Sequence, residues 1–207
     1  DKSARIMGRR CRLETLVTFF KLTLATFGLL YAAALSGMYA FQRDLQYFPT
    51  RRDPAPQAVG LTGVDVVSLP TPDGEVLVLW LSPAQEGRPT ILFLHGNAGE
   101  IADRADRFAF YQSLRFGVAF LSYRGYGGST GAPSEAGLLA DTKAAYDHLR
   151  AEGVPPDRIV LVGESLGTGP AVITAAANPV AAVVLEAPYS AAVDIARAAY
   201  PWAPVGL

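Results

Sequence analysis

The chain has 207 residues, of which 50% are hydrophobic and 18% are charged. This composition provides enough apolar surface for a folded core and excludes a disordered protein. The formal net charge of −1 argues against a nucleic-acid-binding protein, and the single cysteine excludes an internal disulfide. With only two histidines, most histidine-rich metal sites are also excluded, and we expect neither a metal nor another cofactor.

The first predicted element is an apolar segment over residues 22–41, which carries no charged side chain. A helix rises about 1.5 Å per residue, so this segment would cross the roughly 30 Å hydrocarbon core of a bilayer. A cleaved signal peptide would have a shorter apolar core and a small-residue cleavage site. A buried helix of a small domain would not be apolar on all sides. We therefore expect a transmembrane anchor, with the lipid bilayer as its partner.

The charges around this segment predict its orientation. Residues 1–21 form a basic flank, and basic residues concentrate on the cytoplasmic side of membrane helices. The sequence therefore predicts a single-pass membrane protein whose remaining residues lie on the non-cytoplasmic side. Arg43, Arg51 and Arg52 follow the segment and reduce the charge asymmetry. The basic residues that precede it are Lys2, Arg5, Arg9, Arg10 and Arg12.

Residues 42–60 are charged and rich in proline, and they are predicted to be a linker or a strap along the following domain. The domain itself is expected over 61–207. Its first predicted elements are strands over 64–69 and 75–81. The turn signal Pro72-Asp73-Gly74 between them favours an antiparallel hairpin.

From residue 90 onward, short apolar runs alternate with amphipathic segments. Such alternation predicts a mostly parallel sheet with helices on both faces, and the apolar runs are typical of strands buried on both sides. The predicted strands are 90–94, 118–122, 159–162 and 180–185, and the predicted helices are 100–115, 134–152, 166–177 and 190–199.

The segment from Gly163 to Gly167 matches the pattern G-x-S-x-G and lies between a predicted strand and a predicted helix. That context is the one a nucleophile elbow requires, in which a sharp turn presents the serine above the sheet. Glycines on either side allow strand and helix to approach closely. A chance match in a glycine-rich turn is the alternative. We predict that Ser165 is a nucleophile.

The segment His95-Gly96-Asn97 follows another predicted strand. Acyl transfer requires backbone N–H groups directed at the developing oxyanion. We expect these N–H groups to come from Asn97 and from Leu166, the residue after the nucleophile. His95 and Gly96 are predicted to shape the loop. His95 is not expected to be the catalytic base, because in sites built on a nucleophile elbow the base follows the nucleophile in the sequence.

Three further features receive structural interpretations. Residues 122–129 are rich in glycine but lack the spacing of a phosphate-binding loop, so they are predicted to form a turn near the site. His148 lies within a helical pattern and is interpreted as a surface or helix-packing residue. Glu164 is interpreted as a packing or polar support beside the serine.

These motifs together resemble the α/β-hydrolase superfamily, and within it the membrane-anchored serine hydrolases that include the α/β-hydrolase-domain proteins 13 and 17. The resemblance extends over roughly residues 40–207. The segments that carry it are the apolar N-terminal segment, LQYFPTR (45–51), HGNAG (95–99), SYRGYGGS (122–129), PSEAGL (133–138), GESLG (163–167), LEAPYS (185–190) and YPW (200–202).

The resemblance implies an α/β-hydrolase fold with a Ser-His-Asp triad, with Ser165 at the nucleophile position and Asn97 and Leu166 at the oxyanion-hole positions. In the family, the acid and the base follow further strands beyond the YPW segment. No histidine follows Ser165 here, and Asp194 lies where the family has a structural helix. We therefore expect a fold that is incomplete at its C-terminus, arising either from a fragment or from a truncated gene product.

The function predicted from these residues is hydrolysis of an ester, thioester or similar acyl bond of a small-molecule substrate. A catalytically inactive, membrane-tethered binding module is the main alternative, because the triad acid and base are not found in the sequence. A peptidase or an acyltransferase on the same fold is a further alternative. The oligomeric state is left open.

Overall fold

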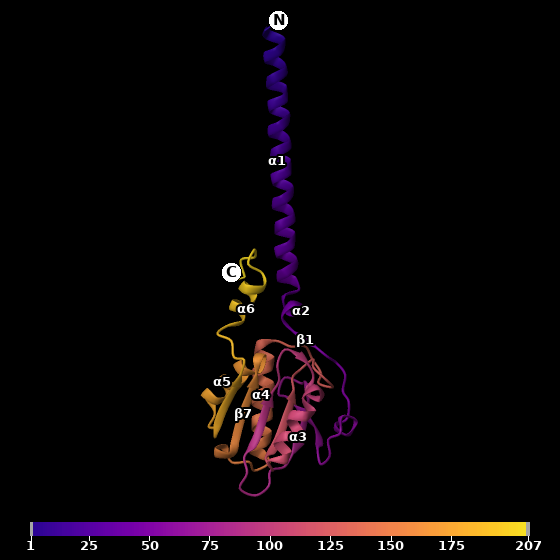
Figure 1. Ribbon diagram of the computed structural model, residues 1–207, viewed down its shortest axis with the longest axis vertical. Coiled ribbons are helices and arrows are strands. Elements are labelled where there is room, and N and C mark those ends of the chain that lie inside the picture. Colours follow the sequence, from indigo (N-terminus) through magenta and orange to yellow (C-terminus); the bar gives the residue numbers. More distant parts are fainter. Residues whose placement is uncertain (1, 206–207) are drawn as a thin grey trace. The chain divides into compact units, whose positions relative to one another are not determined.

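The computed structural model describes residues 2–205, with side chains described from Arg12 onward. The chain divides into two compact units, Asp1–Leu45 and Gln46–Leu207 (Figure 1). The first unit contains α1 (Lys2–Ala40) and most of the short helix α2 (Gln42–Gln46). The second contains all of the strands.

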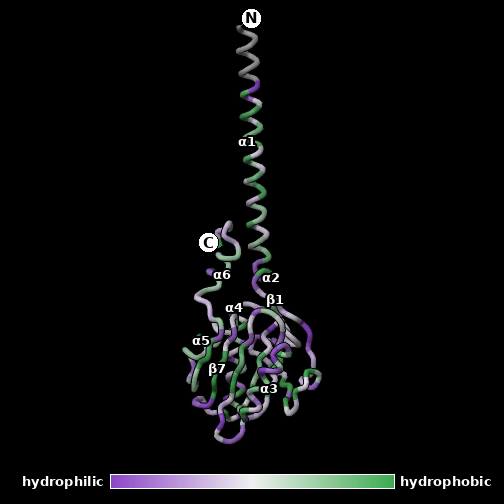
Figure 2. Tube along the Cα trace, viewed as in Figure 1, coloured by the Kyte–Doolittle hydropathy of each residue, from purple (hydrophilic) through white to green (hydrophobic). Residues whose placement is uncertain are grey.

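Helix α1 is longer than the apolar segment alone, because the residues before it are also helical. Its part from Arg12 to Ala40 is long and apolar enough to cross a membrane, and none of it is buried. Figure 2 shows hydrophobic residues along much of this helix. The predicted anchor, 22–41, lies within this helix except for Phe41, which forms the turn that follows.

The main sheet has six strands in the order β2-β3-β6-β4-β7-β8. Strands β2 and β3 form the predicted antiparallel hairpin, and β3 is also antiparallel to β6. The strands β6, β4, β7 and β8 are parallel, as the alternating pattern predicted. Their bounds are β2 Asp65–Pro70, β3 Val76–Ser82, β4 Thr90–Leu94, β6 Gly117–Ser122, β7 Ile159–Glu164 and β8 Ala182–Glu186.

Helices cover both faces of this sheet. Along β3, Leu77 and Leu79 point to one face, and Val78 and Trp80 point to the other. The first face packs against α4 (Glu135–Ala151) and α5 (Thr168–Ala177), and the second packs against α3 (Ala105–Ser113). A last helix, α6 (Ala192–Ala199), follows β8. This is the predicted α/β arrangement, and the carboxyl ends of the parallel strands β6, β4, β7 and β8 lie along one edge of the sheet.

Two predicted helices begin with a tighter turn than expected. The segment predicted as one helix over 100–115 contains a 3₁₀ helix, η2 (Ile101–Arg104), followed by α3. The helix predicted from residue 166 begins with η4 (Ser165–Gly167), which leads into α5. The latter follows from the sharp turn at Ser165, where φ is 47°.

The segment predicted as a linker, 42–60, belongs to the second compact unit from residue 46 onward. It contains β1 (Phe48–Pro49) and the 3₁₀ helix η1 (Pro56–Val59). Strand β1 pairs in parallel with β5 (Ala98–Gly99), outside the main sheet. Tyr47 is only 5% exposed and belongs to the core, so the compact unit begins at residue 46 rather than at 61. We call residues 46–53 the strap.

Candidate active site

Ser165 occupies the turn between β7 and α5. Its φ of 47° lies in the left-handed region, which a residue with a side chain adopts at an energetic cost. The hydroxyl of Thr168 donates a hydrogen bond to the Ser165 carbonyl at 2.6 Å and fixes the turn. The side chain of Ser165 is half-buried. Local strand-turn-helix geometry of this kind presents the serine at the carboxyl edge of the sheet.

Both glycines of the motif are required by close approaches. A Cβ added to Gly163 would lie 2.6 Å from the Gly167 carbonyl oxygen, so strand and helix start are in contact there. A Cβ added to Gly167 would overlap the carbonyl oxygen of Leu94 and lie 3.0 Å from that of His95. The serine turn therefore packs directly against the end of β4.

The residues after β4 form the 95–100 loop, which lies beside the serine turn. A Cβ added to Gly96 would lie 2.9 Å from Glu164 Oε1 and 3.6 Å from the Glu164 carbonyl oxygen. The structure thus brings together two motifs that are far apart in the sequence. This proximity is the geometric condition for two backbone N–H groups to act on one oxyanion.

His95 is fully buried at the start of this loop. Its Nδ1 lies 2.7 Å from the Gly96 carbonyl oxygen, and its ring packs against Tyr123 and Tyr126 at 4.6 and 4.9 Å between centroids. Burial lowers the pKa of His95 to about 4. The imidazole is therefore neutral near pH 7 and shapes the loop from within.

Glu164 and Arg104 connect the serine turn to the same loop. Arg104 Nη2 donates to Glu164 Oε1 at 2.7 Å, while Nη1 donates to the carbonyl oxygens of Ala98 and Glu100 at 3.1 and 3.2 Å. Burial raises the pKa of Glu164, but the hydrogen bond and charge of Arg104 outweigh it and leave that pKa below its ordinary value. The carboxylate is thus ionised and acts as a polar support.

Asn97 is held by its side chain. Its Nδ2 donates to the Gln46 carbonyl oxygen at 2.5 Å, and its Oδ1 accepts from the Phe48 N–H at 3.3 Å. The hydroxyl of Tyr126 donates to the carbonyl oxygen and to Oδ1 of Asn97, at 2.9 and 3.0 Å. Tyr126 belongs to the glycine-rich 122–129 segment, which the structure places as a turn against this loop.

Neither histidine of the chain lies where a base for Ser165 would act. His95 is enclosed and neutral. His148 lies in the last turn of α4, and a helix that follows a parallel strand returns to the opposite edge of the sheet. Asp194, in α6, accepts from Ser190 Oγ at 2.5 Å and from Arg197 at 3.2 Å. Both of these partners lie within four positions of Asp194 in the sequence.

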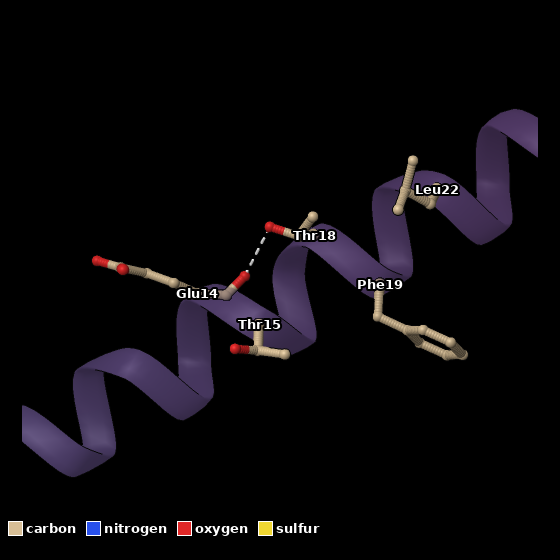
Figure 3. A pocket seen from close by; sticks show the side chains of 5 residues that line it. All are labelled: Glu14, Thr15, Thr18, Phe19 and Leu22. Atoms are coloured by element: carbon tan, nitrogen blue, oxygen red, sulfur yellow. Dashed lines mark hydrogen bonds between the residues drawn. The ribbon is translucent and has the colours of Figure 1, made fainter.

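A shallow hollow on α1 is lined by Glu14, Thr15, Thr18, Phe19 and Leu22, and Figure 3 shows that all of them project from this one helix. Within this helix, the Thr18 hydroxyl donates a hydrogen bond to the Glu14 carbonyl oxygen at 2.8 Å. Over the side chains that the structure describes, no group of three or more acidic, histidine or cysteine residues is placed to hold a metal ion.

A sequence model of a family described as having the alpha/beta hydrolase fold matches residues 89–205, more than half of the chain. The chain belongs to the alpha/beta hydrolase family. The matched range includes the 95–100 loop and the serine turn.

Named relatives and solved structures are similar to the chain over most of its length. It is 37% identical to the uncharacterized protein MT2364 of Mycobacterium tuberculosis over 95% of the chain and 69% of that protein. It is 35% identical to the alpha/beta hydrolase domain-containing protein WAV2 of Arabidopsis thaliana, over 90% of the chain and 64% of that protein. The esterase Pf2001 of Pyrococcus furiosus superposes with a TM-score of 0.57 at 22% identity, over 68% of the chain and 58% of the esterase.

Several residues of this alpha/beta hydrolase site were not identified from the sequence. These residues come into contact with the 95–100 loop only when the chain has folded. They are Arg104, Tyr126 and the strap residues Gln46 and Phe48. The segment LQYFPTR contains two of the strap contacts, yet its residue types alone do not indicate their partners. Glu164, by contrast, has the supporting role expected for it.

Proposed function

We propose that the protein is a serine hydrolase that cleaves an ester, thioester or similar acyl bond of a small-molecule substrate. The observation that carries the proposal is the position of Ser165. It lies on a turn with positive φ, and its neighbours Glu164 and Gly167 are packed against the loop that starts at His95. Family membership and the fold it shares with an esterase also support hydrolysis.

In the proposed reaction, Ser165 Oγ attacks the acyl carbonyl carbon and its proton passes to a general base. The carbonyl oxygen becomes an oxyanion that accepts hydrogen bonds from the N–H groups of Leu166 and Asn97. Loss of the protonated leaving group gives an acyl-serine, which water then cleaves to release the acid and restore the hydroxyl. Two of these roles are filled by residues of the serine turn and the 95–100 loop.

The general base is assigned to neither His95 nor His148, for the reasons of burial and position given above. The alternative function is that of a catalytically inactive, membrane-tethered binding module. Only the hydrolase would turn over a substrate in a reaction that requires Ser165, and this property distinguishes the two functions.

We further propose that α1 is a single-pass anchor that holds the hydrolase unit on the non-cytoplasmic side of a membrane. The length and apolar character of Arg12–Ala40 support the anchor. The basic residues that precede the apolar segment support the orientation.

The experiment that tests the function uses the protein as the gene encodes it, assayed with short p-nitrophenyl esters. We expect Ser165→Ala to abolish hydrolysis while the melting temperature changes little, because the half-buried hydroxyl leaves only a small cavity. Ser68→Ala is the matched control, since Ser68 is exposed on strand β2. Equal activity in both variants would contradict the proposal.

A further inference from the structure

The strap makes main-chain and side-chain contacts to the first half of the 95–100 loop. The amide group of Asn97 connects two strap residues, donating to Gln46 and accepting from Phe48. The strap then runs beside the loop as β1, which pairs in parallel with β5. These contacts do not belong to the main sheet. They support the loop after β4 has ended at Leu94, in addition to the contacts from Arg104 and Tyr126.

The far end of the strap reaches the second half of the loop through Arg52. Its Nη2 lies 3.1 Å from Oε1 of Glu100 and 3.3 Å from Oδ1 of Asp103. The side chain of Glu100 is only 2% exposed, whereas that of Arg52 is 69% exposed. A nearly buried carboxylate is costly without a counter-charge, and the strap supplies this one.

A third set of contacts joins the strap and the loop to the 122–129 turn. The Tyr126 hydroxyl donates to both oxygens of Asn97, and the N–H of Gly127 donates to the Thr50 carbonyl oxygen at 2.8 Å. Asn97 is thus held from both sides, by the strap on one and by Tyr126 on the other. Its backbone orientation depends on both.

We propose that the strap is a positioning element of the hydrolase, and that it holds the Asn97 N–H in the direction required by the oxyanion. The inference rests on the proposed function. An oxyanion donor must be held within about 0.5 Å of its productive place, and a loop beyond the end of a strand needs supporting contacts to achieve this. Because the strap begins at the last residue of α2, which follows α1, the segment between the proposed anchor and the domain contributes to the rate of the reaction.

The test compares two variants that loosen these contacts with two matched controls, in the full gene product. Tyr126→Phe removes the hydroxyl that holds Asn97, and Arg52→Gln removes the counter-charge of Glu100. Tyr146→Phe is the control for the first, because the Tyr146 hydroxyl donates a comparable bond to the Pro179 carbonyl oxygen at 2.8 Å.

The control for the second is Arg88→Gln, since Arg88 is exposed before β4, at the edge opposite the site. An oxyanion donor acts mainly in the transition state, and its complete removal costs about 100- to 1,000-fold in kcat. For a donor that is loosened, we expect kcat to fall about tenfold with KM within about twofold, in both Tyr126→Phe and Arg52→Gln. Both controls should keep the kcat of the wild type.

The outcomes separate this proposal from the proposed function. If Ser165 is required for hydrolysis and kcat falls only in Tyr126→Phe and Arg52→Gln, the proposal is supported. If Ser165 is required but these two variants keep the kcat of the wild type, or change only in melting temperature, the strap has no positioning role while the hydrolase assignment stands. If Ser165 is not required, both proposals are overturned.

Discussion

At the scale of single residues, the environment of His95 decides its chemistry. The ring is enclosed by Tyr123 and Tyr126, and burial is the main cause that lowers its pKa to about 4. A histidine in this state cannot exchange protons with a substrate near neutral pH. The burial of His95 also explains why a histidine so close to the serine turn is a structural residue.

The first prediction concerns the titration of His95. Its pKa in the folded state lies below the ordinary value of 6.5, so the unfolded chain binds the proton more tightly. The stability that results is complete above pH 6.5 and is lost as the pH falls from there towards about 4. We expect the imidazole Hε1 resonance of His95 to stay unchanged between pH 8 and about 5.5. A midpoint near 6.5 would show that the ring is accessible to water.

The second prediction concerns the glycines of the serine turn. Gly167→Ala would place a methyl group onto the Leu94 carbonyl oxygen, and we expect it to lower the free energy of unfolding by about 1–3 kcal/mol. Gly169→Ala is the matched control, because its added Cβ meets only the Tyr189 hydroxyl, at 3.4 Å. In helix α5 it should be neutral or stabilise by up to about 1 kcal/mol. Urea unfolding of both variants measures the difference, and equal stabilities would exclude the close approach.

At the scale of elements, Arg124 connects the hairpin turn to helix α4. It donates to Asp73 at 2.7 Å and, through Nε and Nη2, to Asp141 at 2.9 and 2.8 Å. Asp141 is fully buried, and burial raises its pKa even though Arg124 opposes this. One guanidinium therefore compensates a buried carboxylate and a surface carboxylate at once.

The third prediction follows from Asp73, whose pKa is lowered to about 2, mainly by its hydrogen bond from Arg124. A carboxyl group whose pKa is lowered in the folded state stabilises it above the ordinary value of 3.8. That contribution is lost as the pH falls from about 4 to about 2. We expect Asp73→Asn to be less stable than the wild type at pH 6 and equally stable near pH 2. A stability difference that does not change with pH would contradict the ion pair.

The elements of the domain were largely predictable because their patterns are local. The segment 90–94 is a run of apolar residues, and β4 has those bounds. The split of 100–115 into η2 and α3 was not predictable. It depends on Asp103, whose carboxylate accepts from the Glu100 N–H at 2.9 Å and tightens the first turn. The periodicity of apolar residues does not indicate a side-chain-to-backbone hydrogen bond of this kind.

The candidate site was predictable only where a short motif defined it. Ser165, Leu166 and the 95–100 loop follow from patterns of five residues, and the fold places the two segments in contact. The strap contacts the loop through residues that are 51 positions apart in the sequence, as in the hydrogen bond from Asn97 to the Gln46 carbonyl oxygen. Arg104 donates to the carbonyl oxygen of Ala98, which is 6 positions away. No local pattern of charge or hydropathy indicates which partner an arginine or an asparagine will have.

At the scale of the whole molecule, α1 and the α/β unit have opposite surface properties. The part of α1 from Arg12 to Ala40 has none of its residues buried, although it is strongly apolar. Exposed leucines and phenylalanines over this length favour a lipid environment. The α/β unit, in contrast, has two clusters of buried apolar residues, one on each face of the sheet.

The fourth prediction tests the anchor and its orientation. Leu29→Lys combined with Leu30→Lys places two charges in the apolar segment, each costing about 2.5–3.5 kcal/mol at the centre of a membrane helix. We expect the wild type to resist extraction by alkaline carbonate and the double variant to be extracted. Leu13→Lys, near the start of the span, is the control and should remain in the membrane.

The orientation is tested with protease added outside intact cells or spheroplasts. We expect the α/β unit to be degraded, because the basic flank predicts that it lies outside the cytoplasm. A unit that is protected until the membrane is lysed would reverse the orientation and leave the anchor in place.

The assignment of Ser165 as the nucleophile can be tested by reaction of the full gene product with a fluorophosphonate probe, followed by peptide mapping. The probe modifies a serine only where its hydroxyl is activated and an oxyanion is stabilised. We expect one modified residue, Ser165, and no labelling of Ser165→Ala. An unlabelled protein, or a label on another serine, would contradict the assignment.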